Sequence, residues 1–256
     1  KIDQALLKLD GTVNKTRYGA NSILGISLAA WRLAAKIKKQ PLWRQFSNKP
    51  LLPLPFMNVI NGGRHANNTL SIQEFMIVPR ANSFKETLRI GAEVYQELKK
   101  DIQRKYPGQT AVGDEGGFAP NLKTEKQALD FLEQSIHDLG YTKKVKIAID
   151  AAASEFYKKG AYYLHKQRRS AGQMIDYYQS LIKSYPIISL EDPFDQDHFE
   201  EWQELTKKTK IQLVGDDLLV THPTRIKLGI QHHLCNALLL KVNQIGTVLE
   251  SLEAAQ

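Results

Sequence analysis

Three acidic residues and one lysine stand at the ends of short apolar segments that predict β-strands. Asp150, Glu191 and Asp216 each follow such a segment, and Lys241 ends a fourth. Glu191 and Asp216 are 25 residues apart, as are Asp216 and Lys241, which suits one strand–helix unit. Because the carboxyl ends of parallel barrel strands share one rim, we expect all four side chains to lie at a single mouth.

Carboxylates gathered in this way predict a site for a divalent cation. Like charges repel each other unless a cation lies between them, and oxygen-only ligands favour a hard ion such as Mg²⁺. The alternative is that each acid caps the helix that follows it. Capping is the better interpretation of any single acid, but the set of Asp150, Glu191 and Asp216 favours metal binding.

Lys241 is a candidate general base in the same site. A neighbouring cation disfavours the charged ammonium form, lowers the pKa of the lysine and leaves an amine that can accept a proton. A salt bridge between Lys241 and one of the acids is the alternative, and the strand pattern alone leaves it open.

Two glycine-rich segments provide further candidates. Residues 112–120 place Asp114 and Glu115 among three glycines before a proline, and residues 61–65 place a glycine pair before Arg64 and His65. Glycine allows a backbone to approach a ligand closely. Each segment is a weak signal by itself, since Asp-Gly and Glu-Gly turns are common and an isolated histidine in a loop is usually a surface residue.

The elements that must position these residues alternate between strands and helices. This alternation predicts an α/β fold with a parallel sheet and crossover helices, most simply a (β/α) barrel. Prolines around Pro50 predict a domain boundary there, after a helix that is apolar on most sides and therefore packed between other elements. Thr124 and Gln127 form a capping-box pattern, and Gly140 should close that helix. The predicted strands are 56–60, 72–78, 145–150, 187–190, 211–214 and 237–241, with a hairpin over 156–165, and the predicted helices are 21–39, 83–106, 124–140, 172–184, 198–209, 223–233 and 247–256.

Composition narrows the class of protein. The chain has 256 residues, of which 42% are hydrophobic and 24% charged, as in an ordinary globular protein. Its apolar runs are too short to span a membrane, and its one cysteine, Cys235, excludes an intrachain disulfide. The net charge of +8 is scattered in short groups, so we expect a solvated surface and no nucleic-acid partner. We expect a cytoplasmic protein.

Taken together, the motifs resemble those of the enolase (phosphopyruvate hydratase) family. The resemblance covers nearly the whole chain and keeps the order of the family. The matching segments are 15–25, 61–63, 72–77, 112–120, 150–156, 189–195, 215–218 and 238–246.

This resemblance implies an activity, the Mg²⁺-dependent dehydration of 2-phospho-D-glycerate to phosphoenolpyruvate in glycolysis. Lys241 would take the C2 proton, and Glu115 would be the acid that helps the C3 hydroxyl to leave. Further roles are implied for six residues, with Asp150, Glu191 and Asp216 as Mg²⁺ ligands and His65, Gln73 and Glu74 around the substrate. A Lys base beside Mg²⁺ is a known pattern of the wider superfamily.

The resemblance also implies that the sequence is incomplete. In the family a two-layer α+β domain precedes this start, and we expect residues 1–50 to be its helical end and 51–256 to be a partial (β/α) barrel. A His-Arg-Ser segment and a second active-site lysine would follow Gln256. The family usually forms homodimers, which we expect of the full-length parent. Arg64, Leu219 and His222 depart from the family pattern without touching a predicted catalytic position.

Three hypotheses follow for the function. The first is the enolase reaction of the parent protein. The second is a catalytically inactive piece that binds partners through its basic surface. The third is another acid–base enzyme of the enolase superfamily, against which the 113–120 loop and the Gln73-Glu74 pair argue. Cell-surface roles known in the family have no signal in this sequence.

Overall fold

The computed structural model describes all 256 residues, which form two compact units. Unit 1 comprises Lys1–Leu52, Leu218–His232 and Leu238–Gln256. Unit 2 comprises Pro53–Asp217 and His233–Ala237. Most predicted site residues therefore belong to unit 2, whereas Lys241 belongs to unit 1.

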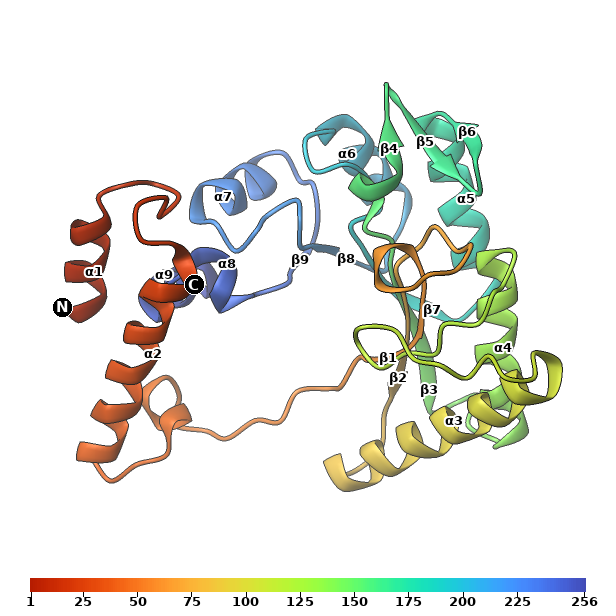
Figure 1. The fold of residues 1–256 in the computed structure, drawn as a ribbon, viewed down its shortest axis with the longest axis horizontal. Helices are drawn as coiled ribbons and strands as arrows, with labels where there is room; N and C mark the ends of the chain where they lie inside the picture. The colour runs from red at the N-terminus through yellow and green to blue at the C-terminus, as the bar shows by residue number, and fades with distance from the viewer. The chain divides into compact units, whose positions relative to one another are not determined.

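A six-stranded sheet with the order β1-β2-β3-β7-β8-β9 organises unit 2 (Figure 1). In β2 and β3 residues on both faces are buried, which is why these segments are nearly continuous apolar runs and do not alternate. The strands are β1 (Met57–Asn61), β2 (Glu74–Pro79), β3 (Val145–Asp150), β7 (Ile187–Glu191), β8 (Gln212–Gly215) and the short β9 (Ala237–Leu238).

The direction of the second strand differs from the prediction. β3, β7 and β8 are parallel, but β1 and β2 pair antiparallel, and so do β2 and β3. The α/β class is therefore correct, and the expectation of a wholly parallel sheet is wrong for β2 alone, since β1 runs in the same direction as β3. The reason is the connection after β2, where two helices intervene. One crossover helix returns the chain to the same end of the sheet, whereas a second helix reverses its direction again.

Helix α3 (Phe84–Lys105) illustrates why the predicted helices form. Its first turn is capped by Ser83, whose side chain accepts a hydrogen bond from the backbone N–H of Glu86. Its buried face is mainly apolar, with residues at the three-to-four spacing of a helix and no exposed surface on Ile90, Val94, Leu98 and Ile102. At Gly91 a Cβ would collide with the sulfur of Met57, so this glycine allows α3 to pack close to β1.

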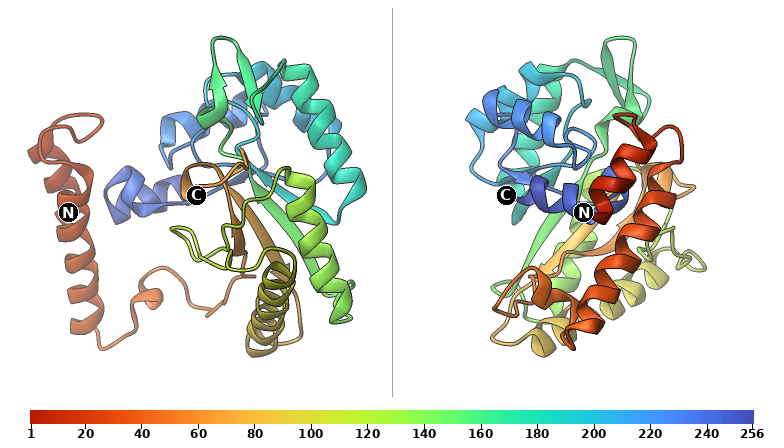
Figure 2. Two further views of the ribbon diagram at one scale, coloured as in Figure 1. Left: turned by 45° about the vertical axis from the view of Figure 1, so that its right-hand side comes forward. Right: turned by 90° about the vertical axis from the view of Figure 1, so that its left-hand side faces the viewer.

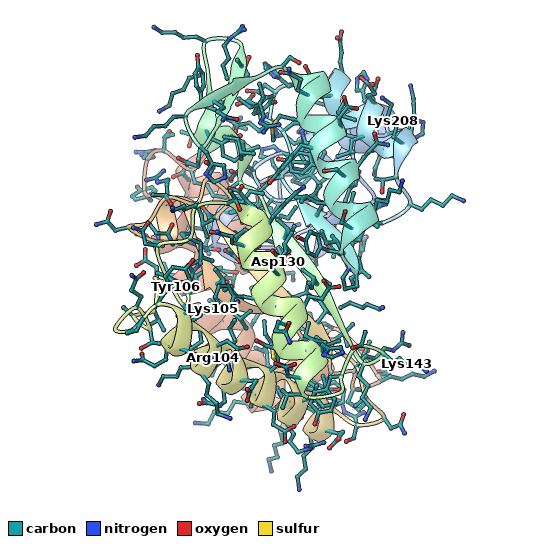
Figure 3. All side chains as sticks on the ribbon, turned by 90° about the vertical axis from the view of Figure 1, so that its right-hand side faces the viewer. Arg104, Lys105, Tyr106, Asp130, Lys143 and Lys208 are labelled. Carbon is teal, nitrogen blue, oxygen red and sulfur yellow. The ribbon has the colours of Figure 1, made fainter.

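Helix α4 (Glu125–Asp138) packs beside α3 and against β2 (Figure 2). Aromatic and charged side chains join the two helices where α3 ends (Figure 3). There Lys105 Nζ lies 4.7 Å from the centre of the Phe131 ring, and the Tyr106 ring lies 6.0 Å from it. Asp130 accepts a hydrogen bond of 2.7 Å from the Tyr185 hydroxyl, which ties α4 to the segment before β7.

The capping pattern predicted at Thr124 is half correct. The Thr124 side chain accepts from the N–H of Gln127, as expected. The Gln127 side chain, however, accepts from the backbone of Lys123 and not from that of Thr124. A complete capping box exists at Ser170 and Gln173, where it opens α5 (Ala171–Ser184). The remaining crossover helix of unit 2 is α6 (Phe199–Lys208).

A second, three-stranded sheet contacts α5 (Figure 1). It consists of β4 (Tyr157–Lys158), β5 (Ala161–Leu164) and β6 (Gln167–Arg169), all antiparallel. The predicted hairpin around Lys159 is confirmed, whereas β6 was not predicted. Two-residue turns join the strands, and short 3₁₀ helices span Gly63–His65 and Ala153–Phe156.

Unit 1 consists of helices. They are α1 (Ile2–Asp10), α2 (Ala20–Ile37), α7 (Pro223–Gln231), the short α8 (Val242–Ile245) and α9 (Val248–Ala255), with a 3₁₀ helix at Leu42–Gln45. Buried Asp3 ties three of them together, because it accepts hydrogen bonds of 3.0 Å from Trp31 Nε1 and from the N–H of Leu249. Buried Lys15 pairs with Glu250 at 2.8 Å.

The long helix α2 is less enclosed than its composition predicts. It contacts α1, α8 and α9, but Ile26, Leu33 and Ile37 are exposed. The predicted strand over 237–241 is also shorter than expected, since β9 ends at Leu238. No helix of the structure is both long enough and apolar enough to pass through a membrane.

Candidate active site

The strand register aligns polar residues at one edge of the sheet in unit 2. Asn61 is paired with Glu74, Glu74 with Asp150, and Asp150 with Glu191. Glu74 joins this row because β2 runs antiparallel to β3, so that the first residue of β2 lies beside the last residue of β3. Glu191 is paired with Val214, two residues before Asp216. Four neighbouring strands thus bring their polar residues to the same edge.

Five carboxylates at this edge form two overlapping groups. Oxygen atoms of Asp150, Glu191 and Asp192 lie within 4.8 Å of one another, and so do those of Asp192, Asp216 and Asp217. The three predicted ligands therefore belong to one acidic site, and Asp192 is the member common to both groups. Asp192 directly follows Glu191 in the sequence and was not among the predicted ligands.

The contacts of Asp192 explain how it holds the two groups together. Its carboxylate accepts backbone hydrogen bonds from Asp216 at 3.1 Å and from Asp217 at 2.6 Å. Asp192 also adopts a positive φ of 39°, which is uncommon for a residue with a side chain. Its carboxylate therefore fixes the loop that follows β8 against the end of β7.

Burial and mutual repulsion make these carboxylates difficult to ionise together. Asp150, Asp192 and Asp216 are only 5%, 2% and 7% exposed. Burial, followed by the negative charges of Asp150, Asp192, Asp216 and Glu74, raises the pKa of Glu191 to about 10. Burial, followed by the charge of Asp150, raises the pKa of Asp192 well above its usual range. Several ionised carboxylates so close together need a positive charge between them. Because all their donor atoms are oxygens, a hard divalent cation suits the site.

Asp150 is held in place by two further contacts. Gln73 Nε2 donates to Asp150 Oδ2 at 3.2 Å, and the N–H of Ala152 donates to Oδ1 at 2.9 Å. Gln73 was predicted to lie around the substrate. Its contact with Asp150 gives it a positioning task at the acidic site.

The glycine-rich loop brings a second cluster to the same edge. His65 Nδ1 lies 3.4 Å from Glu74 and 3.9 Å from Glu115, and the three residues form a compact group. Asn58 Nδ2 donates to Glu115 at 3.2 Å. The structure therefore brings Glu115, the predicted acid, together with His65 and Glu74, which were predicted to lie around the substrate.

The glycines of this loop are required by close packing on β1. A Cβ on Gly117 would lie 2.5 Å from Asn61 Oδ1 and 3.0 Å from the Ile60 carbonyl carbon, and a Cβ on Gly113 would collide with the His65 carbonyl. A backbone that approaches so closely leaves no room for side chains. Packing on β1 holds the loop that carries Glu115.

Several buried polar atoms beside this loop have no hydrogen-bond partner. They are Asn58 Oδ1, both amide atoms of Asn61, and His65 Nδ1, whose 3.4 Å contact with Glu74 is an ion pair without the geometry of a hydrogen bond. Buried polar groups are normally paired, so their clustering marks a place where a polar ligand or water belongs. Neither asparagine was predicted as a site residue. The sequence signals were that both lie on the strand before the Gly62-Gly63 pair and that Asn61 begins the matching segment 61–63.

Lys241 lies in unit 1, beyond the end of β9. Lys241 directly precedes α8 and is exposed. Its backbone N–H donates a hydrogen bond of 2.9 Å to Thr221 Oγ1. Its role as a general base therefore stays a prediction.

Comparison with known proteins decides the family. The family model described as "Enolase, C-terminal TIM barrel domain" matches residues 49–256, and the model described as "Enolase, N-terminal domain" matches residues 1–46. The chain belongs to the enolase family. The enolase of Methanocaldococcus jannaschii is 51% identical over 261 residues, a match that covers 100% of this chain and 62% of that protein. The chain therefore spans less than two thirds of the length of this enolase.

The family assignment confirms the sequence-based resemblance. The enolase barrel-domain match includes both carboxylate groups, the glycine-rich loop and Lys241. The three departures from the family pattern have structural explanations in this chain. Arg64 forms an exposed ion pair with Glu155, buried Leu219 contacts Gly229, and the ring of His222 accepts from the N–H of Thr224 at the start of α7.

Proposed function

We propose that the protein to which this chain belongs catalyses the Mg²⁺-dependent dehydration of 2-phospho-D-glycerate to phosphoenolpyruvate in glycolysis. The observation that carries the proposal is the acidic row Glu74, Asp150 and Glu191, shared by three neighbouring strands of an enolase-family chain. The proposal includes a division near residue 50 between the end of the N-terminal domain and the barrel domain. It also includes a homodimer in the cytoplasm.

Removal of the C2 proton is the difficult step of this reaction. A proton next to a carboxylate is very weakly acidic, because its loss adds negative charge to a group that is already an anion. Mg²⁺ held by Asp150, Glu191 and Asp216 would supply the positive charge that stabilises the oxygens of the substrate carboxylate. Two further residues support these ligands. Gln73 donates a hydrogen bond to the carboxylate of Asp150, and the carboxylate of Asp192 accepts one from the backbone N–H of Asp216.

The proton transfers fall to two other residues. We assign Lys241 as the base that takes the proton from C2. We assign Glu115 as the acid that gives a proton to the C3 hydroxyl, so that the C3–O bond breaks, water leaves and the C2–C3 double bond forms. The contacts of Glu115 with Asn58 and with the His65–Glu74 pair support this assignment, because they hold its carboxyl group at the loop. His65 and Glu74 would bind the substrate around the leaving group.

The test is turnover by the full-length protein, followed through the ultraviolet absorbance of phosphoenolpyruvate. We expect Glu115→Gln and Lys241→Ala each to lower kcat by about 10²–10⁴-fold, the usual contribution of a positioned acid or base. Lys210→Ala removes an exposed lysine elsewhere and should leave kcat unchanged. A parental rate from Lys241→Ala, or a parent that binds Mg²⁺ without turnover, would overturn the proposal.

A further inference from the structure

A basic depression in unit 2 shares no residue with the acidic site. Its volume is about 960 Å³, and it is lined by Lys123, Lys158, Lys159 and Lys166, together with His165 and Tyr163. None of its lining residues belongs to the two carboxylate groups or to the cluster around Glu115. The proposed reaction at the acidic site does not involve these four lysines.

The charge of this depression is unbalanced. No aspartate or glutamate lines it, and none of the four lysines forms an ion pair. All four are exposed. Four ammonium groups facing one depression repel each other, and an anion with several charges would remove that repulsion.

The buried carboxylate of Glu125 contacts residues that line the depression, but it forms no ion pair with any of the four lysines. It pairs with His165 Nε2 and accepts from the Tyr177 hydroxyl at 3.2 Å and from the N–H of Ser71 at 3.2 Å. Glu125 therefore acts as an anchor behind the depression. It holds His165, and with it the turn that carries Lys166.

The walls of the depression are braced before any ligand arrives. The N–H of His165 donates to Ser71 Oγ at 3.0 Å, and Thr69 Oγ1 donates to the carbonyl of Leu122, beside Lys123. Asn68 Nδ2 donates to the carbonyls of Asn61 at 2.9 Å and of Pro120 at 3.2 Å. A site that is already ordered loses less conformational entropy on binding.

The turns that carry the lysines have an unusual backbone. Lys159, His165 and Lys166 have φ values of 50°, 51° and 64°. Two-residue hairpin turns with positive φ normally contain asparagine, aspartate or glycine, because larger side chains are disfavoured there. Both hairpins of the small sheet thus place basic side chains where the turn itself favours other residues, and strained positions of this kind concentrate at functional sites.

We propose that this depression binds a small oligophosphate. Lysine ammonium groups bind phosphate as point charges. The Ser71 hydroxyl, whose oxygen accepts from the N–H of His165, has a hydrogen to donate to a phosphate oxygen. A single phosphate carries too little charge to balance four lysines, whereas a chain of phosphates balances them. The volume is within the usual range for small-molecule sites. A long polyanion would require a continuous basic stripe, and the basic residues of this chain are scattered.

The test is calorimetric titration of the full chain with inorganic triphosphate, without Mg²⁺, at about 0.15 M salt. The site variant replaces Lys123, Lys158, Lys159 and Lys166 by Gln. A matched control replaces four other exposed lysines without ion pairs by Gln, and so lowers the net charge by the same amount as the site variant. These lysines are Lys85, Lys99, Lys143 and Lys210. Figure 3 shows Lys143 at the far end of unit 2 from the small sheet.

We expect the site variant to weaken triphosphate binding by about tenfold or more, and the control to change it by less than about twofold. The corresponding Lys-to-Arg variant should retain binding. Equal weakening in both Gln variants would mean that overall charge alone attracts the ligand, and would overturn the proposal. Absence of binding to the unaltered chain, or retention of heparin or RNA through these lysines without triphosphate binding, would also overturn it. Single substitutions at the exposed Lys158 and Lys166 repeat the test should the fourfold variant fail to fold.

Discussion

Replacement of Gly117 by alanine tests whether close packing on β1 holds the catalytic loop. The added Cβ would lie 2.5 Å from Asn61 Oδ1, 2.9 Å from Asn58 Oδ1 and 3.0 Å from the carbonyl carbon of Ile60. The two amide oxygens could rotate away. The Ile60 backbone cannot, because it belongs to a strand whose side chain at this position is completely buried.

The loop must therefore move away from β1 to accept the methyl group. Overpacking of this kind costs about 1–3 kcal/mol of the free energy of unfolding. The displaced loop also carries Glu115, so we expect kcat of the full-length protein to fall together with stability. The two effects have one cause and should appear together.

Urea unfolding measures the stability, and phosphoenolpyruvate formation measures the activity. Gly172→Ala is the matched control, because its Cβ would meet only Ser170 Oγ at 4.0 Å within helix α5. That substitution should stabilise by about 0.5–1 kcal/mol, since alanine is the better helix residue. A Gly117→Ala protein within about 0.5 kcal/mol of the parent, with full activity, would refute the packing argument.

Three further predictions concern separate parts of the chain. Asp150→Asn should weaken Mg²⁺ binding by about tenfold or more in calorimetry, because it removes one charged donor; unchanged affinity would contradict the assignment of Asp150. His165 has a raised pKa through its hydrogen bond with Glu125, so the pair stabilises fully below the ordinary histidine pKa of about 6.5 and is lost as pH rises through the raised value. The destabilisation by His165→Gln in urea should thus be larger at acidic than at alkaline pH, and a pH-independent difference would count against the pair. Lys15→Met should cost about 3–5 kcal/mol, because it leaves Glu250 without its buried partner; recovery of stability in the double variant with Glu250→Gln checks the cause.

Local sequence signals predicted most elements of the fold and failed where long-range contacts decide. For α3, the capping residue Ser83 and the three-to-four spacing of apolar residues were sufficient to predict the helix. The antiparallel direction of β2 was not predictable from alternation, because it depends on two helices, rather than one, packing between β2 and β3. Strand β6 was missed because its turn, His165-Lys166, lacks the asparagine or glycine that normally signals a hairpin.

The same division applies to the candidate site. The sequence by itself determined the chemical types, the spacing of the strand-end acids and the membership of the enolase family, because these depend on residue identity and order along the chain. The tertiary structure decided that Glu74 lies beside Asp150, that Asp192 links the two carboxylate groups, and that Asn58 and Asn61 lie buried beside the loop of Glu115. Each of these depends on strand direction, on register or on backbone hydrogen bonds between distant segments, and the free energies of those contacts exist only when the chain is folded.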